Sequence, residues 1–306
     1  MNFNVTTLGV SSALPTSKRF PTAHVLDVHG HLFLIDCGEG TQIQLRRFKH
    51  KLSRLDNIFI SHLHGDHFFG IFGLLSSLSL LNRKNNLNIF APEGLQKILT
   101  SEHSPIDIEQ LSYKIVFKNH KPGHSKIYED KRISVEAFSL KHRIASWGFV
   151  FRETQKTPNI IKSKISEYNL SISEIVKIKY GADLRTEDGT IIKNEELTTP
   201  ATKARSYAFC TDTVYLEKII PIIKEVDLLY HEATFLHSEK KQAQLSYHTT
   251  AKEAGILAKK ANVKQLLIGH FSARYKILDE LKEEAKTEFE NTVLAYEGLK
   301  VEIKSS

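Results

Sequence analysis

Residues Ser61-His62-Leu63-His64-Gly65-Asp66-His67 place three imidazoles and one carboxylate within six positions, directly after the apolar run 57–60. Burying four such groups without partners would cost several kcal/mol each, whereas one or two divalent cations would satisfy them all. A strand followed by a turn suits such a site, because the strand fixes where the ligands start and the turn lets them converge.

We expect the first two histidines of this stretch to share one ion, and the carboxylate and the third histidine to share a second. Gly65 is expected to supply the backbone freedom that a tight ligand loop needs. The alternative is a cluster that only caps the strand end or forms a solvated surface.

The composition describes a chain with its own hydrophobic core and a moderate excess of positive charge. At 306 residues, of which 41% are hydrophobic, it is large enough to fold alone as one large or two ordinary domains. A net charge of +7 favours a polyanionic partner such as nucleic acid. An excess of 42 Lys and Arg over 35 Asp and Glu also occurs on ordinary surfaces.

The cysteines and the apolar segments indicate the compartment. Cys37 and Cys210 are far apart and form no C-x-x-C pair, so neither a disulfide framework nor a thiolate zinc site is expected. The N-terminus lacks the basic and apolar regions of a signal peptide, and the longest apolar stretch, 68–81, is too short and serine-rich to span a bilayer. We therefore expect a cytoplasmic protein without a membrane partner.

Apolar runs with a period of two alternate with helical segments, as in layered α/β folds. The clearest expected strands are 3–8, 23–28, 31–36, 57–60, 87–91, 113–118, 133–138, 205–210, 226–230 and 265–268. Helices are expected at 68–81, which is apolar nearly all round and should be buried behind the histidine cluster, and at 93–99, 215–224, 251–260 and 277–289. Residues 154–204 are rich in Lys, Glu, Ile and Ser, and we interpret them as an insertion within a single domain of residues 1–306.

Polar clusters follow five of the expected strands, and they would meet if the strand tips share one edge of a sheet or sandwich. Seven of the side chains are competent metal ligands: His62, His64, Asp66, His67, His142, Asp212 and His270. With Asp212 bridging, they complete two adjacent sites of a two-metal hydrolase, in which ions roughly 3.5–4 Å apart activate a water molecule. Taken singly, His142, Asp212 and His270 fit a structural role equally well.

The sequence resembles the short form of ribonuclease Z, the tRNA 3′-processing endonuclease of the metallo-β-lactamase superfamily. The resemblance runs almost from end to end and is carried by residues 8–9, 35–42, 62–67, 73–75, 211–213, 231–235, 247–250 and 270–275. The H-x-H-x-D-H motif alone indicates only the superfamily, which also contains lactamases, thioester hydrolases and flavodiiron reductases. The motifs His231-Glu232-Ala233-Thr234-Phe235 and His248-Thr249-Thr250 narrow it to ribonuclease Z.

This resemblance implies an αββα sandwich of the metallo-β-lactamase fold, two zinc ions per subunit, a homodimer, and cleavage of precursor tRNA after the discriminator nucleotide that leaves a 3′-hydroxyl. The family's metal ligands fall on the same seven residues. Asp66 also matches the residue that accepts a proton from the attacking water. His248, oriented by Glu232, matches the group that protonates the leaving oxygen. His231 is expected to satisfy only a loop and is left out of the site.

The family's flexible arm, which clamps the tRNA elbow, lies where 154–204 is inserted. The expected tip of this arm, 168–173, has neither the glycine nor the proline found in many bacterial members. Four lysines could still contact phosphates, namely Lys162, Lys164, Lys177 and Lys179. The alternative is an exposed, charged insertion without a role in binding.

Two other functions stay open at this stage. A different metallo-β-lactamase-fold hydrolase, acting on a small ester or phosphodiester, would use the same metal ligands but would not need the insertion. A non-catalytic RNA-binding relative could lose ligands freely, yet none of the seven is missing.

Overall fold

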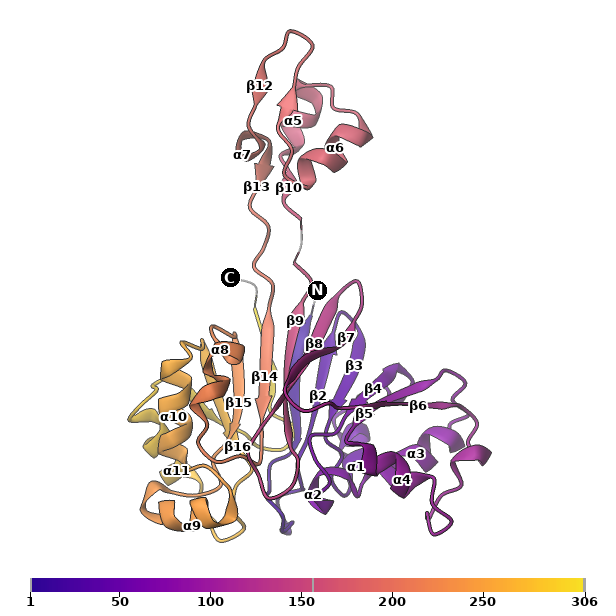
Figure 1. The fold of residues 1–306 in the computed structure, drawn as a ribbon, viewed down its shortest axis with the longest axis vertical. Coiled ribbons are helices and arrows are strands. Elements are labelled where there is room, and N and C mark those ends of the chain that lie inside the picture. The colour runs from indigo at the N-terminus through magenta and orange to yellow at the C-terminus, as the bar shows by residue number, and fades with distance from the viewer. Residues whose placement is uncertain (1, 156, 305–306) are drawn as a thin grey trace. The chain divides into compact units, whose positions relative to one another are not determined.

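The computed structural model describes residues 2–155 and 157–304. The chain divides into two compact units, one formed by Met1–Arg152 with Ser206–Ile303 and the other built on Glu153–Arg205 (Figure 1). The first unit contains two seven-stranded sheets and carries all of the expected metal ligands.

The first sheet combines an antiparallel half with a parallel half. Its strand order is β18 (Lys300–Glu302), β1 (Phe3–Gly9), β2 (Ala23–Val28), β3 (His31–Ile35), β4 (Leu55–Phe59), β5 (Leu87–Ala91) and β6 (Ile115–Asn119). Pairing is antiparallel from β18 to β3 and parallel from β3 to β6. The histidine stretch therefore leaves the carboxyl end of a central parallel strand, β4.

The second sheet also has a parallel part. Its order is β17 (Thr292–Leu294), β16 (Gln265–Gly269), β15 (Leu228–Glu232), β14 (Ser206–Cys210), β9 (Trp147–Glu153), β8 (Ile133–Ser139) and β7 (His124–Glu129). Strands β14 to β17 are parallel, whereas β9 is antiparallel to β14 and β7 to β8. The carboxyl ends of β14, β15 and β16 consequently lie at one edge of the sheet.

Alternating side chains of the first sheet fill two different cores. Phe33 and Phe59 belong to the core shared with the second sheet, and Phe151 of that sheet lies 5.3 Å from Phe59 between ring centroids. Leu34 and Ile58 belong to the core beneath the helices. Strands buried on both faces are expected in an α/β sandwich, and each such side chain contributes about 1.5–3 kcal/mol by leaving water.

Helices cover the outer faces of both sheets, which gives the expected αββα sandwich (Figure 1). The helices on the side of the first sheet are α1 (Thr41–Arg47), α2 (Gly65–Phe68), α3 (Ile71–Leu80) and α4 (Glu93–Leu99). Those on the side of the second sheet are α8 (Ile220–Ile223), α9 (Lys240–Ser246), α10 (Ala251–Lys260) and α11 (Asp279–Lys286). The predicted fold class is thereby confirmed.

The prediction of one buried helix over 68–81 is wrong in two respects. The chain forms α2 and α3 with a break at Phe69 and Gly70, because a Cβ on Gly70 would lie 2.0 Å from the carbonyl oxygen of Gly38 and the backbones meet there. Burial is also one-sided, since Leu80 is 85% exposed. Similarly, the helix expected at 215–224 shortens to a 3-10 turn and α8.

The second unit has a small core of its own. Its elements are β10 (Asn159–Ile160), α5 (Lys162–Glu167), α6 (Ile172–Lys179), β11 (Leu184–Arg185), β12 (Ile191–Ile192), α7 (Asn194–Leu197) and β13 (Thr198–Thr199). Among the described residues of this unit, its core is formed by Leu170, Ile178, Leu184 and Leu197, with partly buried apolar side chains packed against them. Ser171 and Glu174 form a capping box that starts α6.

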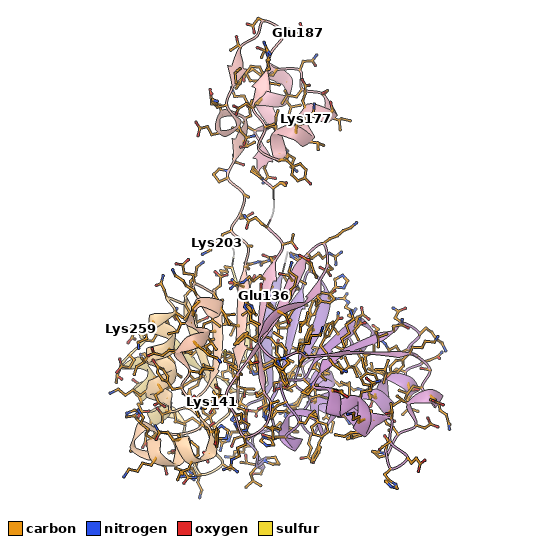
Figure 2. The ribbon with its side chains drawn as sticks, viewed as in Figure 1. Glu136, Lys141, Lys177, Glu187, Lys203 and Lys259 are labelled. Carbon is orange, nitrogen blue, oxygen red and sulfur yellow. The ribbon has the colours of Figure 1, made fainter. Side chains whose placement is uncertain are left out.

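The surface of this unit carries both signs of charge, as Lys177 and Glu187 illustrate in Figure 2. Residues 154–204 hold eight Lys and Arg against seven Asp and Glu, a net charge of only +1. Of the lysines expected to contact phosphates, Lys164 pairs with Glu167 at 2.8 Å. Within 2–155 and 157–304, no helix combines the length and the apolar character that crossing a membrane requires.

Candidate metal centre and active site

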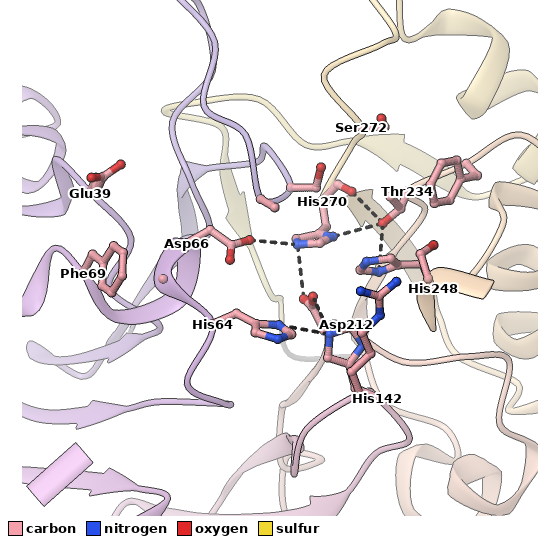
Figure 3. A pocket seen from close by; sticks show the side chains of 16 residues that line it. Glu39, His64, Asp66, Phe69, His142, Asp212, Thr234, His248, His270 and Ser272 are labelled. Carbon is pink, nitrogen blue, oxygen red and sulfur yellow. Dashed lines mark hydrogen bonds and ion pairs between the residues drawn. The ribbon is translucent and has the colours of Figure 1, made fainter. Parts of the chain in front are cut away.

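Strand ends from both sheets bring the seven predicted ligands together. Figure 3 shows His64, Asp66, His142, Asp212 and His270 of this set. The histidine stretch follows β4, Asp212 follows β14, and His270 follows β16. His142 lies in the connection between β8 and β9. Asp212 and His270 both have positive φ angles, 50° and 58°, which are uncommon for residues with a side chain and persist where the surroundings enforce them.

One group of ligand atoms consists of three imidazoles and one carboxylate oxygen. His64 Nδ1 lies 3.1 Å from both His62 Nε2 and His142 Nε2. Asp212 Oδ1 lies 3.7 Å from each of the same two Nε2 atoms. Four ligands about 2.0–2.2 Å from a tetrahedral ion would be separated by roughly 3.3–3.6 Å, so these spacings fit a single ion.

A second group lies beside the first and shares Asp212 with it. Asp212 Oδ2 is 3.1 Å from His67 Nε2 and 3.2 Å from His270 Nε2, and Asp66 Oδ2 is 3.2 Å from His67 Nε2. The two Nε2 atoms are buried and have no hydrogen-bond partner among the described residues. Asp212 therefore turns one carboxylate oxygen to each group of ligand atoms.

The charges around His67 favour a cation at this centre. Burial by itself would lower the pKa of His67, but Asp212, Asp66 and Asp36 together raise it well above its usual range. Burial would raise the pKa of Asp212, yet the neighbouring imidazoles of His270, His67 and His62 lower it well below its usual range. Ionised carboxylates and imidazole nitrogens that lack partners are the donor set that a divalent metal requires.

Three of the predicted ligands, His67, His142 and His270, are oriented by a second contact that the sequence did not predict. Asp36 accepts hydrogen bonds from His67 Nδ1 at 2.7 Å and from the backbone and hydroxyl of Ser61 at 2.7 and 2.8 Å. Thr234 Oγ1 lies 3.0 Å from His270 Nδ1, and His142 Nδ1 donates to the carbonyl of Tyr247 at 3.0 Å. The only sequence signal for Asp36 was an acidic residue at the end of a strand. Such partners hold a ring and tune its basicity.

Glu232 and His248 form a carboxylate–imidazole pair next to the ligands. His248 Nδ1 donates to the two Glu232 oxygens at 3.0 and 3.1 Å, and Glu232 is fully buried. Burial alone would lower the pKa of His248, but the charge and hydrogen bonds of Glu232 raise it to about 9. With Nδ1 engaged, His248 Nε2 is the nitrogen left for chemistry. The ring of His248 lies 5.3 Å from that of His270.

His231 lies outside this arrangement. Its Nδ1 donates to the backbone oxygen of Glu232 at 2.8 Å, and it belongs to none of the groups of converging ligand atoms in the described chain. One further group does include His248, with Asp212 and His270, so geometry alone also allows His248 to bind metal.

A cavity of about 540 Å³ gives access to the centre and is lined by Asp66, His142, Asp212, His248 and His270, among others (Figure 3). Gly65 contributes to it differently from our prediction. It does not have a positive φ; instead, a Cβ at this position would lie 2.4 Å from the ring of Phe69. The glycine therefore makes room for an aromatic ring, not for an unusual backbone angle.

Comparisons with known proteins identify the family. A family model described as anti-Pycsar protein Apyc1 matches residues 3–159, which include the histidine stretch but end before Asp212. The ribonuclease Z of Phocaeicola vulgatus is 47% identical over 306 residues, covering 99% of this chain and 98% of that protein. That match includes the segments of Glu232, His248 and His270.

Solved structures give the same result. Human tRNase Z, short form, superposes with a TM-score of 0.70 at 27% identity, covering 98% of this chain and 99% of its own. A metallo-β-lactamase-fold protein from Bacillus subtilis, 18% identical, also gives 0.70, with 99% and 100% covered, and supports the fold alone. From its full-length relatives, its sandwich and its cluster of metal-competent residues, the chain belongs to the ribonuclease Z family of metal-dependent hydrolases with the metallo-β-lactamase fold.

Proposed function

We propose that this protein is an endoribonuclease that removes the 3′ trailer from precursor tRNA by cutting after the discriminator nucleotide, which leaves a 3′-hydroxyl on the tRNA. The observation that carries the proposal is the Glu232–His248 pair, in which the buried carboxylate holds an imidazole that lines the metal-competent cavity. A general acid held beside a metal centre can protonate a poor leaving group, such as a ribose oxygen, as its bond to phosphorus breaks. Membership of the ribonuclease Z family supports tRNA as the substrate.

The proposal includes two zinc ions per subunit. His62, His64, His142 and Asp212 would hold one, and Asp66, His67, His270 and the other oxygen of Asp212 would hold the second. When bound, such ions supply Lewis-acid stabilisation of the attacked phosphate and lower the pKa of water. Nitrogen and oxygen ligands at these spacings suit zinc, although related divalent metals share this preference.

Two different residues, Asp66 and His248, carry out the two proton transfers of the reaction. Asp66, which lies at the cluster, accepts a proton from the attacking water. His248 delivers a proton to the leaving 3′ oxygen, while Glu232 holds the ring by Nδ1 and favours its protonated form. The two proton-transfer groups are thus separate residues: Asp66 lies in α2 after β4, and His248 lies between α9 and α10.

The arm, the assembly and the compartment are also part of the proposal. Residues 154–204 would act as an arm that contacts the tRNA away from the cut, inserted in a chain that is otherwise one catalytic domain. The active form would be a homodimer, as the family resemblance implies. Cytoplasmic location is supported by Cys37 and Cys210, which are both buried and free.

A direct test compares one precursor tRNA with a chromogenic phosphodiester, using the zinc-loaded protein. We expect a single cut after the discriminator nucleotide, and a tRNA product that a CCA-adding enzyme can extend because its 3′-hydroxyl is free. Chelation should abolish the cut and zinc should restore it. Hydrolysis of the small phosphodiester without any cut in the tRNA would contradict the proposal and favour a small-molecule hydrolase. Light scattering of the same preparation tests the homodimer.

A further inference from the structure

Phe69 is placed unusually for an apolar side chain. Among the described residues it is the only phenylalanine in the group of exposed large hydrophobic side chains, with 53% of its surface exposed. Its neighbour Phe68 is buried, and the two rings are 4.9 Å apart in an edge-to-face arrangement. Phe69 also lines the cavity of the metal centre. An aromatic ring left open to solvent inside an active site suggests a partner that supplies the missing contact.

The ring is held in a fixed position by the backbone of the ligand loop. A Cβ on Gly65 would lie 2.4 Å from the ring, so the ring rests against the loop that carries His64 and Asp66. Phe69 follows α2 directly, with helical φ and ψ of −61° and −25°. Such a ring is pre-organised and loses little freedom when a flat ligand stacks on it.

The position of Phe69 relative to His248 indicates which part of the substrate it can meet. In Figure 3, Phe69 and Glu39 lie on one side of Asp66 and His64, whereas His248 lies on the other side. His248 serves the leaving oxygen, which belongs to the last nucleotide of the tRNA. The nucleotide that keeps the phosphate, the first of the trailer, therefore extends towards the side of Phe69.

The charge on the Phe69 side of the cavity favours one part of the first trailer nucleotide, its base or its sugar–phosphate, over the other. Glu39 lines the cavity and is exposed, and no ion pair to it occurs within the described chain. A carboxylate repels a phosphate, so the sugar–phosphate backbone is disfavoured here and a nucleobase is favoured. Each of the four bases has a flat π-face that stacks on an aromatic ring.

We propose that Phe69 is a stacking platform for the base of the first trailer nucleotide, and that it sets how firmly the trailer is held during cleavage. This inference rests on the proposed function. Because stacking is largely independent of base identity, the contact would serve trailers of any sequence. Removing the ring should lower kcat/KM by about tenfold, which corresponds to about 1.4 kcal/mol.

The test combines variants with a modified substrate. Phe69→Ala, Phe69→Trp and the wild type are assayed on precursor tRNA with a normal or an abasic first trailer nucleotide. Leu80→Ala is the control, because Leu80 is also an exposed apolar residue but lies outside the cavity. We expect Phe69→Ala to lower kcat/KM about tenfold relative to the wild type on the normal substrate. On the abasic substrate the kcat/KM of the variant should equal that of the wild type. The metal content of the variant should be unchanged. Phe69→Trp should retain activity, and Leu80→Ala should match the wild type on both substrates.

Two results would overturn the inference without affecting the proposed function. The first is an equal loss for Phe69→Ala on both substrates, which would make the ring structural. The second concerns wild-type protein and 2-aminopurine: quenching at the discriminator position but not at the first trailer position would place the stacked base on the tRNA side. A wild-type enzyme that makes no cut in precursor tRNA would instead overturn the proposed function itself.

Discussion

The metal centre and the inserted unit of residues 154–204 are built on opposite principles. In the metal centre, buried charged groups converge from several strand ends, and ligands such as His67 are also held by a second hydrogen bond. The inserted unit has a net charge of +1, and among its described residues four buried apolar side chains form the core. In the metal centre the side chains have little conformational freedom. In the inserted unit the small core places few constraints on which residues occupy the surface. Changes in the centre should therefore affect turnover, and changes in the inserted unit should affect binding.

The largest effect is expected from His64→Ala. His64 lies between His62 and His142 and is only partly buried, so its loss should remove metal without unfolding the chain. Losing several kcal/mol of charge stabilisation should lower kcat by at least about 10³-fold. Metal content per chain, kcat and the circular dichroism spectrum check this, with the exposed His103→Ala as control. Full activity in a metal-free preparation would disprove the two-metal mechanism.

His248→Ala should lower kcat by roughly 10²–10⁴-fold, the usual contribution of a general acid, while both metal ions stay bound. The distinction matters because Asp212, His248 and His270 also form a group with ligand spacing. Zinc analysis of the purified variant, alongside its kcat on precursor tRNA, decides between the two roles. If zinc is lost together with activity, His248 is a ligand and its assignment as the acid is wrong.

The convergence of the predicted ligands could be inferred from sequence, whereas the residues that orient them could not. His62 to His67, Asp212 and His270 follow apolar strands, and strand ends meet at a sheet edge in any α/β sandwich. The role of Asp36 depends on how β3 and β4 are paired, because its partners Ser61 and His67 are 25 and 31 residues away. No local pattern reveals such a pairing.

Two further features were hidden for related reasons. Phe69 belongs to an apolar run whose periodicity predicts burial, yet the helix breaks at Phe69 and Gly70 and the Phe69 ring is 53% exposed. The inserted unit can be recognised from the composition of residues 154–204. Its lysines alone suggest a strongly basic surface, but acidic residues nearly balance them, so its net charge is small.

Mild acid should weaken the sandwich through its buried histidines, which the inserted unit lacks. Burial lowers the pKa of His24 to about 3 and that of His120 to about 4, below the ordinary value of 6.5. Between pH 6.5 and these values the unfolded chain binds more protons than the folded chain, so stability falls as pH falls. At pH 5, His24 alone should cost about 2 kcal/mol relative to neutral pH. Residues 154–204 contain no histidine and lack this dependence.

Urea unfolding of the wild type and of His24→Gln at pH 7.5 and pH 5 isolates this contribution, because the two proteins differ only at this residue. As pH is lowered from 7.5 to 5, the free energy of unfolding should fall more in the wild type than in the variant. A difference between the two proteins that stays constant across this range would show that His24 does not stay neutral in the folded state.

The smallest effect, and the sharpest test of the comparison, is expected in the inserted unit. Replacing residues 154–204 by a short Gly-Ser linker should leave metal content and hydrolysis of a small phosphodiester nearly intact. Contacts far from the cut act almost equally in the ground and transition states, so the change should appear in KM. We expect KM for precursor tRNA to rise by about tenfold, or about 1.4 kcal/mol.

Substitutions in and next to helix α6 can distinguish contacts to nucleobases from contacts to phosphates as the source of this affinity. Ile172, Val176 and Tyr180 recur every four residues and are 81%, 48% and 80% exposed, which is an apolar stripe suited to nucleobases. Lys177 and Lys179 of the same helix suit phosphates. Replacing the two lysines by alanine should weaken the salt dependence of tRNA binding by about two counterions. Replacing Ile172 and Tyr180 by serine should raise KM severalfold without changing that dependence, because no charge is removed. If neither pair affects KM for tRNA, the inserted unit is not the tRNA arm, and the affinity must come from the net positive charge of the remaining chain.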